Sequence, residues 1–294
     1  MRKYNSIILT ITAFFMVISN NLLAQISDFA LTEKNRHLYF EAELAGEPVN
    51  IMLESGIPAF LIGRDFYEKT LSKSDIQFEP STAKIVLLNN KYDISFKGNG
   101  NLNVGNTIYN GPIFILDNFD DFRIPVQNFR DKQGNRATIG IDIKNSLFRV
   151  GVTTSQEKIG KSYKIRTDAS MGFIIVTTPI NMHTTESTCQ IKGDLIIDFG
   201  NPSLLFLMKQ HKELAKAINK GKISLKDAYD KDGNLIAQGI YADEITICSN
   251  TYNNISIGVS DKMKSIKQLG FLGVPFFDSL TIFDFDKGTM TVYK

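Results

Sequence analysis

The sequence is poor in the residues and motifs that carry much of enzyme chemistry. Among its 294 residues are two cysteines and three histidines. The histidines, His37, His183 and His211, are too scattered to form a recognisable zinc site. The motifs G-x-S-x-G, H-E-x-x-H and the P-loop are absent, so the sequence lacks the signatures of three large enzyme classes. We therefore expect neither a metal nor a cofactor.

An excess of one charge is also missing once the N-terminal segment is set aside. Arg2 and Lys3 precede an apolar run at 6–18, and Ala24 is a small residue at a suitable cleavage position. Residues 1–24 are therefore expected to be a secretory signal peptide, with an anchor helix as the alternative. Removing them lowers the net charge from +2 to zero. A neutral chain argues against nucleic acid or a membrane surface as partner. We expect an exported protein, periplasmic or extracellular.

Two further questions about covalent and local structure stay open. Export permits a disulfide between Cys189 and Cys248. Both cysteines also lie in alternating apolar runs, which are typical of buried strands, so two buried thiols are equally compatible with the sequence. The stretches 64–72 and 207–220 have helical periodicity, and His211 is expected on the surface of the second helix.

Similar segments occur in the same order in both halves of the chain. An apolar triplet followed by Glu54-Ser55-Gly56 matches another followed by Asp198-Phe199-Gly200, 144 positions later. The hairpin-like segment 102–115 matches 245–258, with Tyr109 aligned to Tyr252.

A third pair aligns 137–151 with 270–285, and places Gly140 opposite Gly273. The segments are rich in β-branched and aromatic residues in short runs broken by Asn, Gly and Asp. We predict a mainly β protein with two pseudo-two-fold-related lobes, residues 25–150 and 151–294, each with a short helix.

Such an axis can bring the two acid-bearing loops face to face. Glu54 and Asp198 would then lie so close that both cannot ionise easily, and they would share a proton. One carboxyl could act as base toward water and the other as acid toward a carbonyl. The glycines, Gly56 and Gly200, allow the two turns to approach each other.

These motifs resemble those of the pepsin-like and retropepsin-like aspartic peptidases, in their two-lobed, single-chain, secreted bacterial form. The resemblance rests on the two strand–acid–x–Gly loops, on the apolar-apolar-Gly motifs at 138–140 and 271–273, and on the C-terminal segment. It implies a cleft for peptide or unfolded protein between the lobes, a Glu54/Asp198 dyad, and a monomer, because both lobes are in one chain.

In that family a β-hairpin covers the acids. Residues 84–96, with a tip at 89–91, fit this flap in the first lobe, and 227–239 occupy the equivalent place in the second. Tyr92 and Tyr229 are the candidate cleft residues on these hairpins.

The active-site loops depart from the family pattern at two positions. Glu54 replaces an aspartate, and Phe199 replaces the hydroxyl residue that helps to lock the loops, whereas Ser55 retains its hydroxyl. Three hypotheses follow. The protein is a peptidase with an unusual dyad, a pseudo-peptidase that binds peptides or proteins, or a structural β protein in which the acids are buried in hydrogen bonds.

Overall fold

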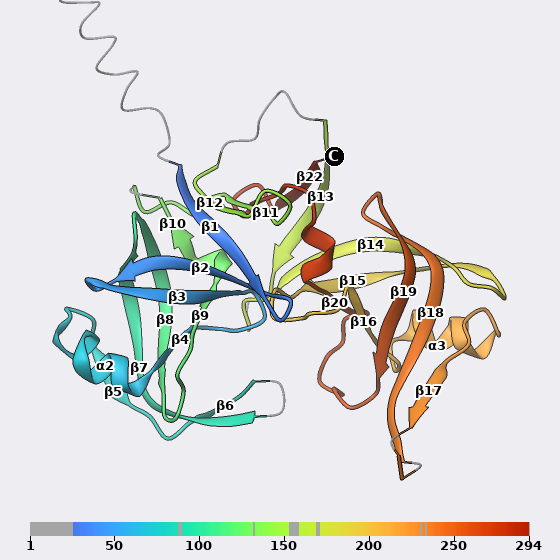
Figure 1. Cartoon of the computed structure of the whole chain (residues 1–294), viewed down its shortest axis with the longest axis horizontal. Coiled ribbons are helices and arrows are strands. Elements are labelled where there is room, and N and C mark those ends of the chain that lie inside the picture. Colours follow the sequence, from blue (N-terminus) through green and yellow to red (C-terminus); the bar gives the residue numbers. More distant parts are fainter. Residues whose placement is uncertain are drawn as a thin grey trace, which may run out of the picture.

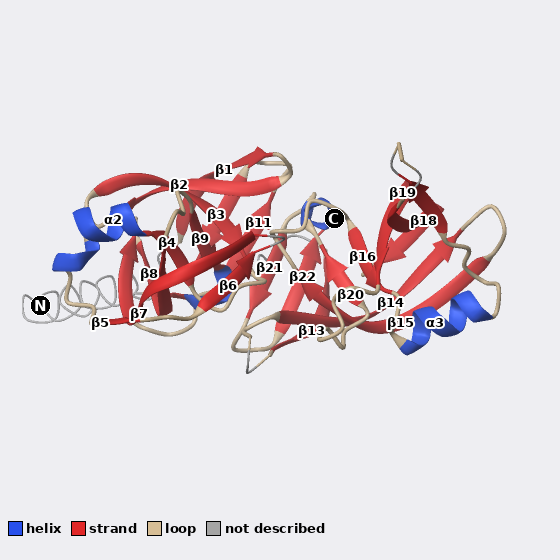
Figure 2. Cartoon of the chain, turned by 90° about the horizontal axis from the view of Figure 1, so that it is seen from below, coloured by secondary structure: helices blue, strands red, loops and turns tan. Residues whose placement is uncertain are grey.

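The computed structural model describes residues 26–87, 90–131, 133–152, 159–168, 171–229, 231–232 and 234–293. The expected signal peptide and Asn89 of the expected flap tip lie outside these residues. Two β-rich lobes lie side by side with a sheet between them (Figure 1). The short helices lie toward the far ends of the two lobes (Figure 2). In the part of the chain that is described, no helix has the length and apolarity needed to cross a bilayer.

The first lobe contains most of the strands up to residue 150. Its elements are β1 Ser27–Lys34, β2 His37–Leu44, β3 Glu47–Glu54, β4 Phe60–Gly63, α2 Arg64–Lys69, β5 Phe78–Pro80, β6 Lys84–Leu87, β7 Asn90–Val104, β8 Thr107–Leu116, β9 Phe122–Pro125, β10 Phe129–Arg130, β11 Ile139–Asp142 and β12 Leu147–Val150, with 3₁₀ turns at Leu71–Lys73 and Val126–Asn128.

The second lobe largely repeats this order, with a longer hairpin at β14–β15 than at the corresponding β2–β3. Its elements are β13 Gly160–Thr167, β14 Ile174–His183, β15 Thr188–Ile197, β16 Leu205–Met208, α3 Lys212–Asn219, β17 Lys226–Tyr229, β18 Leu235–Ile247, β19 Asn250–Ser260, β20 Gly270–Leu272, β21 Thr281–Asp284 and β22 Thr289–Tyr293, with a 3₁₀ turn at Val274–Phe277.

The same strand pairings recur in the two lobes. In the first, β3 pairs in parallel with β9, and β4 pairs in parallel with β8 and antiparallel with β9. In the second, β15, β20, β16 and β19 make the same three kinds of pairing. The matched hairpins also share their register, since Leu102 faces Tyr109 and Ile245 faces Tyr252. The predicted mainly β, two-lobed fold is confirmed.

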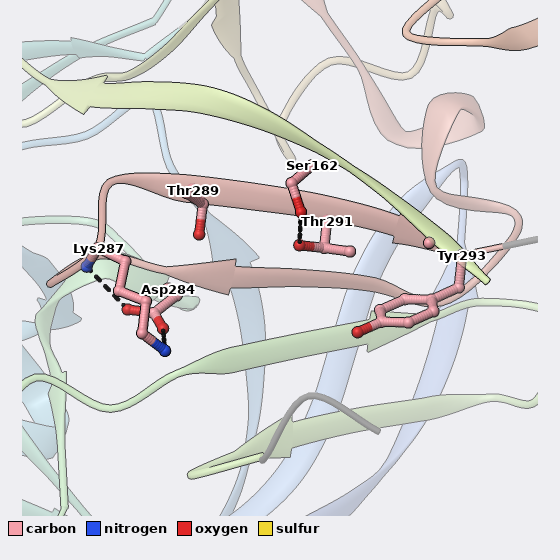
Figure 3. A pocket seen from close by; sticks show the side chains of 7 residues that line it. Ser162, Asp284, Lys287, Thr289, Thr291 and Tyr293 are labelled. Atoms are coloured by element: carbon pink, nitrogen blue, oxygen red, sulfur yellow. Dashed lines mark hydrogen bonds and ion pairs between the residues drawn. The ribbon is translucent and has the colours of Figure 1, made fainter. Parts of the chain in front are cut away.

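A sheet formed by both lobes joins them. Its strand order is β1–β12–β11–β21–β22–β13, and every pairing is antiparallel. Gly140 of β11 faces Ile282 of β21 at the centre of the junction. A polar pocket of about 390 Å³ lies on the second-lobe part of this sheet (Figure 3), where the hydroxyls of Ser162 and Thr291 are 2.8 Å apart.

The expected alignment of Gly140 with Gly273 is wrong. Asp142 accepts a hydrogen bond from the amide of Asn145, and Asp284 accepts one from the amide of Lys287, so the β11–β12 turn corresponds to the β21–β22 turn. The first-lobe counterpart of β20 is therefore β9, which occupies the same place beside an acid-bearing strand.

The second predicted helix is shorter than its periodicity indicates. Residues 205–208 form strand β16, which is buried between β19 and β20, and α3 begins only at Lys212. His211 is the N-cap of α3, where its ring accepts a hydrogen bond from the amide of Glu213. Cys189 and Cys248 are both buried free thiols, which decides the question that the sequence left open.

Candidate active site between the lobes

The first acid is placed by a fully buried strand end. Residues 51–54 of β3 are buried in succession, because β2 and β9 flank the strand and the lobe interior covers it. Glu54 closes this run with only 5% of its surface exposed. A carboxylate at that position is held rigidly and is largely removed from water.

The second acid begins a turn that is tied to its neighbours by backbone hydrogen bonds. The amide of Asp198 donates to the carbonyl of Leu272 in β20, and the amide of Asn201 donates back to the Asp198 carbonyl. Oδ1 of Asp198 accepts a hydrogen bond of 3.0 Å from the amide of Gly200. The carboxylate therefore has a fixed orientation within its loop.

Each carboxylate packs against the glycine of the opposite loop. A Cβ atom added at Gly56 would lie 3.2 Å from Oδ1 of Asp198, and one added at Gly200 would lie 2.7 Å from Oε2 of Glu54. Both glycines are needed because a side chain would occupy the space of the opposite carboxylate. The structure thus brings Glu54 and Asp198 together across the two lobes.

Burial raises the pKa of both carboxyls. For Glu54, burial is the main cause and the charge of Asp198 adds to it, which brings its pKa to about 8. For Asp198, burial raises the pKa to about 6, against the hydrogen bond from Gly200. In this order of ionisation Asp198 loses its proton first and Glu54 retains the shared one.

The hydrogen bonds that lock the loops are present on one side only. The buried hydroxyl of Ser55 donates to the carbonyl of Ile197 at 2.7 Å and accepts from the amide of Phe199 at 3.1 Å. Phe199 has no hydroxyl with which to return these bonds. Its fully buried ring instead packs 4.8 Å from that of Phe277 and 6.0 Å from that of Phe283.

A cation that the sequence analysis missed lies beside the first acid. Nη1 of Arg123 is 3.7 Å from Oε1 of Glu54, and its Nε is 3.0 Å from Oδ2 of Asp121. The guanidinium also lies over the ring of Phe119, 5.6 Å from its centroid. Residues 124–126 (Ile-Pro-Val) resemble 272–274 (Leu-Gly-Val), and this likeness could have identified the strand that carries Arg123 as the counterpart of β20. The alignment of Gly140 with Gly273 concealed it.

One hollow contains the dyad, and a second adjoins it through shared lining residues. The smaller, about 160 Å³, contains both acids together with His37, Tyr39 and Arg123. The larger, about 430 Å³, lies under β6 and shares Gly56, Ile57, Val86 and Leu87 with the first; its lining is mainly apolar, with Lys84 and Lys97 at its edge. Together they form a partly apolar groove that passes the acids.

The predicted flap hairpin is formed by β6 and β7. The pairing of β6 with β7 reaches Leu87 and Asn90, so Asn90 and Lys91 of the expected tip belong to strand β7, and residues 88–89 lie outside the described residues. Tyr92 packs 5.3 Å from the ring of Phe119. Tyr229 is on the predicted second-lobe hairpin, where it is exposed and donates a hydrogen bond to Asp227. Neither is among the described residues that line the two hollows.

The donor set of this site suits proton transfer. Among the described residues, no group of three or more His, Cys, Asp or Glu side chains is placed to hold a metal ion. Two carboxyls of unequal pKa, held face to face and partly shielded from water, are the arrangement that assigns one acid and one base.

One of the comparisons with known proteins, that with solved structures, bears on the fold. No protein-family model matches the chain, and no curated protein matches it in sequence. The structure is similar to the crystal structure of an aspartic proteinase from Irpex lacteus, with a TM-score of 0.57 and 10% sequence identity, over 92% of this chain and 97% of that one. At this identity the likeness concerns the fold alone. The chain therefore has an aspartic-peptidase-like fold.

Proposed function

We propose that the chain is an exported, monomeric endopeptidase-like protein that binds extended peptide between its lobes and hydrolyses it with Glu54 and Asp198. The observation that carries this proposal is the mutual packing of each carboxylate on the opposite glycine. The partly apolar groove beside the acids supports peptide as the ligand, because extended peptides present apolar side chains and a regular backbone.

The proposed mechanism follows from the order of ionisation. Ionised Asp198 takes a proton from a water molecule, whose oxygen attacks the peptide carbonyl, and Glu54 donates its proton to the carbonyl oxygen. In the collapse of the tetrahedral intermediate the carbon–nitrogen bond breaks, Asp198 gives the leaving nitrogen the proton that it took from water, and Glu54 regains a proton from the hydroxyl formed on the carbonyl oxygen, which leaves a carboxylic acid and an amine. No covalent intermediate and no metal takes part.

A second candidate function is peptide binding without cleavage. It is favoured by Phe199, which leaves the loops bonded on one side only, and by the extra methylene of Glu54, which lengthens the side chain by about 1.5 Å. A displacement of about 1 Å can cost about 100-fold in rate. In this function the cleft would bind peptide, and Glu54 and Asp198 would not catalyse its hydrolysis.

The deciding experiment is cleavage of a diverse peptide mixture by residues 25–294, across acid to neutral pH. Asp198→Asn and Glu54→Gln remove one acid each, and Asp261→Asn, an exposed aspartate, is the matched control. We expect cleavage by the native chain and the control, and its loss in both dyad variants. If a folded native chain cleaves nothing, catalysis is excluded, and binding of the same peptides then tests the second function.

A further inference from the structure

Arg123 reaches Glu54 from a neighbouring strand of the same lobe. Strand β9 runs parallel to β3, with Arg123 opposite Met52 and Pro125 opposite Glu54. The guanidinium is held on three sides, by Glu54, by Asp121 and by the ring of Phe119. Its side chain is 19% exposed. An arginine restrained in this way is a fixed charge, unlike a mobile surface cation.

The other half of the dyad has a different neighbour at this register position. In β20 the residue that corresponds to Arg123 is Phe271, opposite Ile196, and its ring packs 6.5 Å from that of Phe206. Within the described ranges, the ion pairs include none to Asp198. The two lobes therefore differ in the length of the acidic side chain and in the charge beside it. Glu54 is the longer acid, and it is also the acid with a neighbouring arginine.

Several charged or titratable groups surround the Glu54 carboxyl. Asp198 approaches from the second lobe, Asp121 and Arg123 come from β9 and the turn before it, and Tyr39 comes from β2. His37, also on β2, has its pKa lowered by burial and then by Arg123. Arg123 favours the ionised form of Glu54, whereas burial and the two aspartates oppose it.

We propose that Arg123 is a positioning residue for the dyad, which fixes Oε1 of the longer Glu54 side chain opposite Asp198 and offsets part of the negative charge that the two acids create. Glutamate at position 54 and arginine at position 123 thus form a matched pair. The role of Arg123 in turnover rests on the proposed function, whereas its effect on the charge of the acids does not.

The direct test is a carboxyl ¹³C NMR titration of the native chain, Arg123→Gln and Arg123→Lys. Removing a neighbouring cation should raise the apparent pKa values of the pair, by about one unit or more in Arg123→Gln. Arg123→Lys retains the charge but not the fork-shaped donor, so its titration should fall between the other two. Arg64→Gln, which removes an exposed arginine paired with Glu68 and Asp117, is the matched control and should titrate like the native chain.

Further variants keep the proposal testable if Arg123→Gln does not fold. Asp121→Asn keeps the arginine and loosens its anchor, but it also removes a negative charge that raises the pKa of Glu54, so the two effects oppose each other and the upward shift should be smaller than in Arg123→Gln. In the Glu54→Asp background, the shorter acid no longer reaches Arg123 equally well, so Arg123→Gln should shift the titration by less than half as much. A shift of equal size in both backgrounds, or a native-like titration of folded Arg123→Gln, would overturn the proposal.

Turnover provides a readout that a purely structural role would not change. If the native chain cleaves peptide, Arg123→Gln should lower kcat about 10- to 100-fold with KM within about threefold, and should move the pH profile upward. If the native chain does not cleave, the proposed function fails, and the titration alone still decides the role of Arg123.

Discussion

The amide of Phe199 donates a 3.1 Å hydrogen bond across the two lobes to the hydroxyl of Ser55. The same hydroxyl donates to the carbonyl of Ile197, so one side chain satisfies two backbone groups of the opposite loop. Because the pseudo-symmetric position carries a phenylalanine, the first loop has no equivalent bonds in return. The relative placement of the two acids therefore depends on Ser55 more than it would in a symmetric pair.

Ser55→Ala should destabilise the folded protein and loosen the dyad. The change leaves the Ile197 carbonyl and the Phe199 amide, both buried, without their partner, at a cost of about 2–3 kcal/mol in the free energy of unfolding. Urea unfolding measures this difference. Ser162→Ala is the control, since its hydroxyl meets only that of Thr291 in the partly buried pocket of Figure 3, and it should cost less than about 1 kcal/mol. Equal losses in the two variants would contradict the lock assigned to Ser55.

Phe199→Thr and Phe199→Val form an isosteric pair that tests whether the missing bonds can be restored. Both remove a buried ring that packs on Phe277 and should lower stability by about 3 kcal/mol. If the threonine hydroxyl bonds across to the first lobe as Ser55 does in the other direction, the threonine variant should be about 1 kcal/mol more stable than the valine variant. Greater stability of the valine variant would show that the hydroxyl remains unpaired.

Gly200→Ala should impair cleavage more than Gly56→Ala. The added Cβ would lie 2.7 Å from Oε2 of Glu54 in the first case and 3.2 Å from Oδ1 of Asp198 in the second. Contact below 3 Å forces the enclosed Glu54 carboxylate to move, and a small displacement of a reacting group costs about 10- to 100-fold in rate. Ratios of kcat/KM for the two variants measure this. In the absence of turnover, a larger change in the Glu54 carboxyl ¹³C shift in Gly200→Ala is the expected result.

The stability of the protein should fall as pH rises from about 5 to about 8. In the unfolded chain Glu54 ionises near 4.5, whereas in the folded protein burial and Asp198 keep its proton until about pH 8. Between these values the unfolded state binds fewer protons than the folded state, so raising the pH favours unfolding, by up to about 1.4 kcal/mol per pH unit. The raised pKa of Asp198 contributes in the same direction at the lower end of this pH range.

Glu54→Gln removes the largest part of this dependence. Chemical unfolding at pH 5, 6, 7 and 8 should give a slope at least halved in the variant, and the variant should be the more stable protein at pH 8. Glu33→Gln, at an exposed position on β1, serves as control and should retain the native slope. A native chain whose stability rises across this range would contradict the burial of a neutral Glu54.

The acid-bearing loops and the paired hairpins were predictable because their signals are local. A buried triplet that ends in an acid and a glycine is read from six consecutive residues, and its recurrence 144 positions later indicates the lobes. The matching hairpins kept even their register, with Tyr109 and Tyr252 opposite equivalent leucine and isoleucine residues. Alternation of apolar residues in each strand is enough to determine such pairings.

Arg123 and the start of α3 were not predictable because tertiary contacts decide them. Parallel pairing of β9 with β3 joins segments that are distant in sequence, and the likeness of 124–126 to 272–274 indicates the strand but not that the side chain of Arg123, which is opposite Met52, reaches Glu54. Residues 205–208 have apolar spacing compatible with a helix, but pairing with β19 and β20 on both edges makes them a buried strand. The alignment of Gly140 with Gly273 failed for the same reason, because Gly140 lies in the sheet that joins the lobes, where β11 pairs with β21.

The sheet that joins the lobes also determines the order in which the chain can complete its fold. On the ribosome, β1, β12 and β11 emerge with the first lobe, but the open edge of β11 has no partner until β21 is made, after strands β13 to β20 of the second lobe. Likewise β13 waits for β22, which closes the second lobe. A nascent chain therefore carries an unpaired strand edge until β21 has been made, and such an edge can recruit other chains. A chaperone that binds unfolded chains would act on this intermediate, and a truncation before Thr281 would make it permanent.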